Sequence, residues 1–180
     1  MIFHKTKING LYILEFEPME DSRGYFVKVF SEKEFKKNKI NFKINEVNKS
    51  FNHKKGTLRG LHFQKKPKAE GKIVQCIRGK IYDVALDLRP SSKTYGAWES
   101  IELSSSDKKM LLIPKGFAHG LQTLTENCEV VYFMDGFYSS EHASGVRWND
   151  PTFNIKWPLK ISNLSEKDKN WPLVKNEEIH

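Results

Sequence analysis

Short apolar runs separated by turn-forming residues are the feature that most limits what this chain can fold into. None of the runs approaches the roughly 18 consecutive apolar residues of a membrane-spanning helix. Turn signals such as Asp21-Ser22-Arg23-Gly24, Lys55-Gly56 and Arg78-Gly79 divide them. This pattern is typical of an all-β sandwich or barrel. Strands are expected over residues 12–17, 25–30, 42–48, 57–64, 72–77, 80–89, 98–103, 110–113, 120–124 and 129–134.

The segment 80–89 shows the clearest alternation with a period of two, which is the side-chain period of a strand. One face of this strand is apolar and consists of Tyr82, Val84, Leu86 and Leu88. The other face carries two carboxylates and consists of Ile81, Asp83, Ala85 and Asp87. Because buried carboxylates need polar partners, we expect the mixed face to border a polar cavity.

Helix signals are few. The sequence Ser31-Glu32-Lys33-Glu34 has the form of a capping box and predicts one helix that runs to about Lys39. A second short turn is expected near 165–170. With 180 residues and no internal repeat or linker, the chain is expected to form a single domain over residues 1–180.

The charge of the chain is +8, from 30 basic and 22 acidic residues, which indicates a lysine-rich surface. The sequence has neither a basic helix nor a long block of like charge, so we expect no nucleic-acid partner and no membrane partner. Arg23 and Arg59 carry more information because both stand in glycine-marked segments. A guanidinium group is preferred where a planar fork must bind phosphate.

Cys76 and Cys128 lie in apolar, strand-like runs without CxxC spacing. This placement favours buried, reduced thiols over a disulfide or a metal site. The first ten residues, MIFHKTKING, lack the apolar region of a secretion signal. The expected location is therefore the cytoplasm.

The segment richest in chemistry is Thr57-Leu58-Arg59-Gly60-Leu61-His62-Phe63-Gln64. A histidine within a strand is more often structural than catalytic, so His62 means little by itself. Together with its neighbours, however, it resembles the dTDP-4-dehydrorhamnose 3,5-epimerase family, whose signature is an arginine-glycine-leucine-histidine strand followed by an aromatic residue and glutamine. Further motifs of that family follow in order between residues 21 and 168: Gly71-Lys72, Arg78-Gly79, residues 83–89, residues 113–120, Tyr132, residues 147–151, Trp157-Pro158 and residues 164–168.

The resemblance implies a double-sheet jelly-roll barrel of the cupin kind with a few short helices. Most cupins hold a metal through two histidines separated by one residue, plus later ligands. Here the first motif reads His62-Phe63-Gln64, and the second supplies only His119. Two imidazoles without a third ligand make a poor transition-metal site. We therefore expect no metal and no other cofactor.

The family's substrates are nucleotide-linked 4-keto sugars, whose ketone acidifies the hydrogens on the neighbouring carbons. Inversion at such a carbon needs a base, a group that stabilises the enolate, and an acid on the opposite face. The resemblance implies that His62 is the base, that Asp168 orients its imidazole, that Lys72 stabilises the enolate and that Tyr132 is the acid. The implied product serves the synthesis of surface polysaccharides.

The resemblance also implies how substrate binds. Arg23 and Arg59 would hold the pyrophosphate, with Arg23 reaching across from the second subunit of a homodimer. Tyr138 would stack on the nucleotide base. The remaining polar contacts would come from Gln64, Asp83 and His119. Since Arg59 and His62 are three residues apart, an ideal strand would point them to opposite faces, so Gly60 is expected to mark a bulge.

Departures from the family pattern fall around base recognition. Lys28 replaces a commonly acidic residue, Val47-Asn48-Lys49-Ser50 replaces Asp-Asn-His-Ser, and Phe137 replaces the first tyrosine of a pair. The nucleotide carrier, the sugar and the number of inverted centres therefore stay open. Alternative functions are a C3-only epimerase, a 3,4-ketoisomerase, a non-catalytic sugar-nucleotide-binding protein and a metal-dependent cupin oxygenase.

Overall fold

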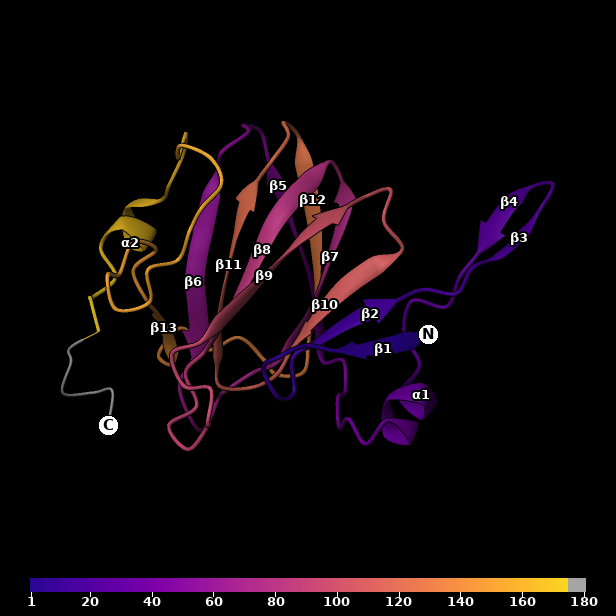
Figure 1. The fold of residues 1–180 in the computed structure, drawn as a ribbon, viewed down its shortest axis with the longest axis horizontal. Coiled ribbons are helices and arrows are strands. Elements are labelled where there is room, and N and C mark those ends of the chain that lie inside the picture. Colours follow the sequence, from indigo (N-terminus) through magenta and orange to yellow (C-terminus); the bar gives the residue numbers. More distant parts are fainter. Residues whose placement is uncertain (175–180) are drawn as a thin grey trace.

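Two antiparallel sheets packed face to face form the body of the protein in the computed structural model, which describes residues 1–174 (Figure 1). This arrangement confirms the expected all-β, double-sheet barrel with short helices. One sheet has the strand order β1 (Ile2–Lys5), β2 (Tyr12–Glu15), β10 (Lys109–Ile113), β7 (Lys72–Arg78), β12 (Cys128–Met134) and β5 (Glu46–Asn52). The other has the order β13 (Ala143–Gly145), β6 (Leu58–Gln64), β11 (Phe117–Thr123), β8 (Lys80–Asp87) and β9 (Trp98–Ser104).

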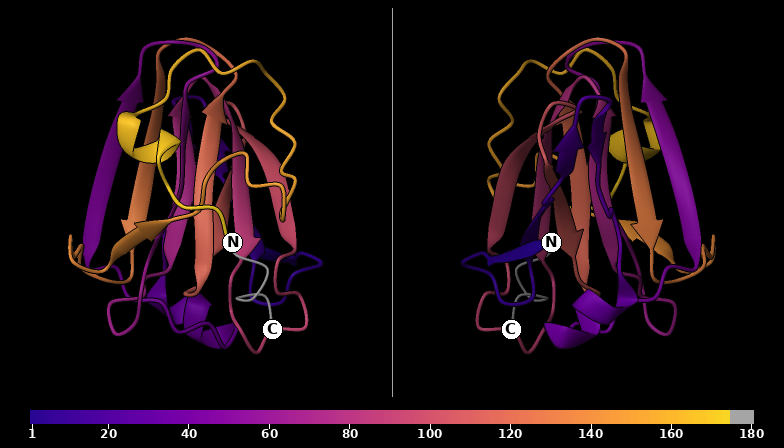
Figure 2. Two further views of the ribbon diagram at one scale, coloured as in Figure 1. Left: turned by 90° about the vertical axis from the view of Figure 1, so that its left-hand side faces the viewer. Right: turned by 90° about the vertical axis from the view of Figure 1, so that its right-hand side faces the viewer.

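Strand β8 is buried on both of its faces. Ile81 and Ala85 point between the two sheets, where they pack in an apolar cluster with residues of β7, β10 and β12. Val84 and Leu86 point outward, where Phe153 and Trp157 of the C-terminal segment cover them. In Figure 2 this segment crosses the outer side of the five-stranded sheet. The apolar face predicted from the alternation thus lies outside the barrel and is covered by the end of the chain.

A hairpin formed by β3 (Met19–Asp21) and β4 (Gly24–Phe26) stands away from the two sheets, on the opposite side of the molecule from α2 (Figure 1). It carries exposed apolar side chains at Met19, Tyr25 and Phe26. Helix α1 (Glu32–Lys37) is capped by Ser31, whose hydroxyl accepts a bond from the Glu34 amide, as the capping box predicted.

Two predicted strands were placed wrongly. Residues 27–30 and 42–45 lie outside the strands, because their apolar side chains, including Phe42 and Ile44, pack around Phe35 of α1. The strand expected over 42–48 is β5, which begins at Glu46. Strand β11 begins at Phe117 rather than at residue 120. Three short strands were missed: β1, β3 and β13.

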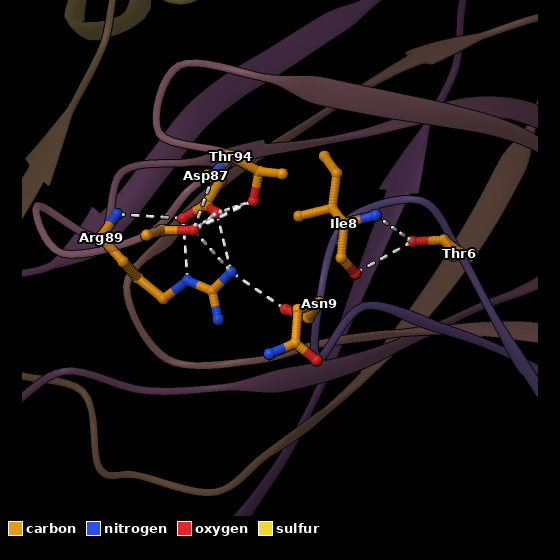
Figure 3. A network of polar contacts seen from close by, with 7 residues as sticks. Thr6, Ile8, Asn9, Asp87, Arg89 and Thr94 are labelled. Carbon is orange, nitrogen blue, oxygen red and sulfur yellow. Dashed lines mark hydrogen bonds and ion pairs between the residues drawn. The ribbon is translucent and has the colours of Figure 1, made fainter.

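The second carboxylate of β8, Asp87, holds a polar cluster at the end of the strand (Figure 3). Arg89 donates to it through Nε at 2.8 Å and Nη2 at 2.7 Å, and Thr94 donates through its hydroxyl at 2.7 Å. Arg89 also donates to the carbonyl of Asn9 and so ties the β1–β2 loop to the 87–94 loop. Asp87 therefore serves the fold and not the cavity that its position in the alternation predicted.

Cys76 and Cys128 are both buried and free, which confirms the predicted thiols. In the part of the chain that the structure describes, no helix has the length and apolar character needed to cross a membrane.

Candidate active site

A cavity of about 450 Å³ opens between the two sheets, lined along the length of β6 on one side and by residues of β5 and β12 on the other. A smaller hollow of about 290 Å³ adjoins it and shares Asn48, Arg59, His62, Lys72 and Tyr132 with it. His119 lines the smaller hollow as well. The structure thus confirms that His62, Lys72, His119 and Tyr132 open into one cavity.

The geometry of β6 lets two residues of its motif reach this cavity. His62 pairs with His119 of β11, but Arg59 pairs with Leu121, so β6 has one residue more than β11 between these pairs. Gly60 lies at this irregularity with a φ of +122°, and the peptide bond that follows it is cis. The predicted bulge at Gly60 is confirmed, and it places Arg59 and His62 on the same side of the strand.

His62 is held by a carboxylate from the far end of the chain. Its Nε2 lies 2.6 Å from Oδ1 of Asp168 on α2 (Glu166–Lys169), and Asp168 is 3% exposed. Burial raises the pKa of Asp168, but hydrogen bonds from His62, the Gly60 amide and Trp171 outweigh it and hold that pKa below its usual value. The carboxylate is therefore charged and can fix the imidazole's orientation and tautomer.

Tyr132 lies on β12 of the opposite sheet. Its hydroxyl is 3.1 Å from the Ser50 hydroxyl, and its ring meets that of His119 edge-on at 6.1 Å. Burial raises the pKa of Tyr132 to about 12. The hydroxyl consequently keeps its proton at neutral pH and can act as a donor.

The Lys72 amine is buried beside the carboxylate of Glu70. Its Nζ lies 3.4 Å from Oε1 of Glu70, and its side chain is 8% exposed. Burial lowers the pKa of Lys72, while Glu70, Asp83 and Asp135 oppose that effect. A positive charge here would lie on the same cavity wall as Tyr132 and could stabilise an oxyanion.

The side chains around the cavity do not form a suitable set of ligands for a metal ion. His119 Nε2 is bonded to Asp83 at 2.7 Å, and His62 is bonded to Asp168. Over residues 1–174, histidine, cysteine and carboxylate side chains form no group of three or more that could hold an ion. The second imidazole of the cavity thus belongs to a second carboxylate–histidine pair.

Only some of the predicted substrate-binding residues line the cavity. Arg59 and Tyr138 line the cavity, and Tyr138 is 62% exposed at its mouth. Gln64 also lines it, but its side-chain amide is already engaged: the nitrogen donates to the Glu70 carboxylate and to two backbone carbonyls, and the oxygen accepts from the Ser139 amide. Asp83 is fully buried behind its bond to His119. Arg23 stands on the projecting hairpin, paired with Asp21 and 88% exposed at its side chain, outside the cavity of its own chain.

Three side chains that the sequence did not single out contact the four predicted catalytic residues, and a fourth, Asn52, accepts a bond from Arg59 Nε at 2.6 Å. Ser50 meets Tyr132, Glu70 meets Lys72, and Trp171 donates to Asp168 at 3.2 Å. Proximity in the sequence could have indicated only two of these contacts, because Glu70 stands two residues from Lys72 and Trp171 stands three residues from Asp168.

Comparison with known proteins agrees with this geometry. The family model for dTDP-4-dehydrorhamnose 3,5-epimerase matches residues 5–176. A dTDP-4-dehydrorhamnose 3,5-epimerase of Methanothermobacter thermautotrophicus is 44% identical over 97% of this chain and 95% of its own.

Solved structures show the same likeness. The Bacillus anthracis epimerase with TDP and pyrophosphate bound is 40% identical, with a TM-score of 0.93 over 96% of this chain and 99% of its own. The Legionella pneumophila epimerase in complex with dTDP-4-keto-L-rhamnose is 34% identical, with a TM-score of 0.90 over 98% and 96%. A 3'-monoepimerase of Streptomyces bikiniensis in complex with dTDP-quinovose is 29% identical, with a TM-score of 0.86 over 94% and 86%. This chain therefore belongs to the dTDP-4-dehydrorhamnose 3,5-epimerase family, whose members are isomerases that act on nucleotide-linked sugars.

Proposed function

We propose that this chain inverts C3 and C5 of a dTDP-linked 4-keto-6-deoxy sugar, with His62 as the base and Tyr132 as the acid. The observation that carries the proposal is their placement on opposite sheets around one cavity, His62 on β6 and Tyr132 on β12. Inversion requires a proton to leave from one face of a carbon and return to the other. Two proton-transferring groups on opposite walls meet that requirement.

The imidazole has a defined orientation for this task. Because Nε2 of His62 donates to Asp168, Nδ1 is the atom that takes the substrate proton, and the charge that develops on the ring is balanced by the carboxylate. As the C–H bond breaks, its electron pair moves into the enolate, whose oxygen Lys72 would stabilise. Tyr132 then donates its proton to the same carbon from the other side.

Substrate anchoring would divide between two subunits. Arg59 and Tyr138 would hold the pyrophosphate and the base, with the His119–Asp83 pair as a polar wall near the sugar. Arg23 is too far out on its hairpin to join its own site, so we infer a homodimer in which the hairpin reaches the partner's cavity. The exposed apolar side chains of the same hairpin support that contact.

We also infer that the enzyme works in the cytoplasm and supplies a sugar for a surface polysaccharide. Inversion at C3 alone is the second candidate, favoured by the likeness to the Streptomyces bikiniensis monoepimerase. NMR of dTDP-4-keto-6-deoxyglucose in deuterated water tests both. Deuterium at C3 and C5 supports the proposal, and deuterium at C3 alone supports the second candidate. Absence of exchange with dTDP-, GDP- and CDP-linked 4-keto sugars would favour a non-catalytic binding protein, and a 3-keto product would reveal a ketoisomerase.

A further inference from the structure

The indole of Trp171 lies against the proposed His62–Asp168 pair. Its Nε1 is 3.2 Å from Oδ1 of Asp168, the same oxygen that contacts His62 Nε2 at 2.6 Å. The indole and imidazole rings meet edge-on with centroids 6.3 Å apart. Because an indole N–H can only donate, the direction of the bond to the carboxylate is fixed.

The surrounding residues hold the indole in this place. Gly145 of β13 pairs with His62 on β6, and a Cβ at Gly145 would overlap the indole. Gly145 lacks a positive φ, so the space for the ring, and not the backbone, requires a glycine here. The carbonyl of Trp171 accepts from Arg147 at 2.6 Å, and the Lys167 ammonium lies 5.2 Å from the ring centroid.

We propose that Trp171 is a positioning residue that sets the strength of the Asp168 carboxylate as the partner of His62. The inference rests on the proposed role of His62 as the base. Asp168 accepts three N–H bonds: from His62 and Trp171 on Oδ1, and from the Gly60 amide at 3.3 Å on Oδ2. Each donor takes part of the negative charge, so the indole weakens the attraction of Asp168 for the imidazole proton.

A change in pH dependence follows from this arrangement. Without the indole N–H the carboxylate is more basic, so His62 keeps its second proton up to a higher pH and acts as a base only above it. In the described chain, none of the other titratable groups around the cavity donates to Asp168. These groups are Glu46, Lys49, Arg59, Glu70, Lys72, Asp83, His119, Tyr132, Tyr138 and Lys167.

The test is Trp171→Phe, which keeps an aromatic ring and removes the donor. The acidic limb of kcat/KM, which reports the free enzyme, is expected to move up by about 0.5 pH unit or more. At pH values above the limb the rate should return to within severalfold of the wild type. The matched control is Trp157→Phe, which removes an indole bond to the Trp148 carbonyl away from the cavity and should leave the limb in place.

Two further measurements keep the outcome independent of folding and of turnover. Gly145→Ala keeps the indole but pushes it away, and it should move the limb in the same direction. NMR titration should show the His62 imidazole losing its proton at a higher pH in Trp171→Phe. An unchanged limb and an unchanged titration in a folded Trp171→Phe variant overturn the proposal. If His62→Ala retains full exchange, the proposed base fails instead, and the NMR titration still decides whether Trp171 acts on His62.

Discussion

Arg59 and His62 stand three residues apart on β6, yet both line the same cavity because β6 carries one extra residue at Gly60. The glycine is needed for two reasons. Its φ of +122° is unfavourable for other residues, and a Cβ there would lie 2.5 Å from the Gly120 Cα and 2.8 Å from the His119 carbonyl. The bulge thus brings Arg59, which we propose binds the pyrophosphate, to the same cavity as His62, the proposed base.

Replacing this glycine should disturb fold and site together. Gly60→Ala is expected to lower the free energy of unfolding by about 2 kcal/mol or more and to reduce epimerisation strongly, since β6 must shift against β11. Urea unfolding measures the first effect. Gly24→Ala is the control for backbone strain, because Gly24 has a φ of +124° but no atom within 4 Å of the added Cβ. If both variants lose the same free energy of unfolding, the close approach of Gly60 to β11 does not contribute to stability.

The residues alone predicted the parts of this site that depend on one strand. The long-range contact between His62 and Asp168 followed only from the family resemblance, and long-range contacts outside the family motifs were not predicted. The motif of β6 and the glycine within it indicated the histidine, the arginine and the bulge. Phe42 and Ile44 alternate like a strand, but their burial against α1 decided their conformation. Likewise, nothing local marks Trp171 as a neighbour of His62, because β13 and α2 bring them together only in the folded chain.

The buried Asp87 should make stability depend on pH. Burial opposes its charge, but bonds from Arg89, Ser92 and Thr94 lower its pKa to about 2. A carboxylate with a lowered pKa stabilises the fold above its unfolded value of 3.8, and this stabilisation, about 2 kcal/mol, is lost as the pH falls from about 4 toward 2.

Asp87→Asn should therefore be less stable than the wild type at pH 7 and should show a smaller change in stability between pH 5 and pH 3, as measured by urea unfolding. Glu32→Gln removes a carboxylate whose ion pair with Lys36 is exposed, and it should change stability little. An Asp87→Asn variant with the wild-type pH profile would contradict the assignment.

Activity should survive prolonged chelation followed by gel filtration, because the two cavity histidines are each held by a carboxylate. Elemental analysis of the treated protein verifies that metal is gone. If turnover disappears on removal and returns with zinc, iron or manganese, His62 cannot serve as the proposed base.

Arg23 should act in the partner's site. Arg23→Ala and His62→Ala homodimers are each expected to lose most activity, but unfolding and refolding them together should restore about a quarter of it. Half of the mixed dimers are hybrids, and each hybrid has one intact site. Recovery would not occur if Arg23 served its own chain, or if light scattering showed a monomer.

Mutation of the proposed base and of the proposed acid should have different effects on solvent exchange and on net inversion. His62→Ala is expected to lower both solvent exchange and net inversion by about 10²- to 10⁴-fold, because the enolate no longer forms. Tyr132→Phe keeps the ring that meets His119 but removes the hydroxyl. Exchange of substrate hydrogen for deuterium should then persist while inversion falls, since the enolate can regain a proton from the His62 side.

The comparison is made by NMR in deuterated water, with exchange and inversion followed in the same sample. Ser50→Ala is a useful intermediate, because it leaves the Tyr132 hydroxyl in place and removes its 3.1 Å neighbour. It should lower inversion less than Tyr132→Phe does and leave exchange intact. If Tyr132→Phe abolishes exchange while His62→Ala retains it, the two roles are reversed. If neither variant changes either rate, the chemistry takes place outside this cavity.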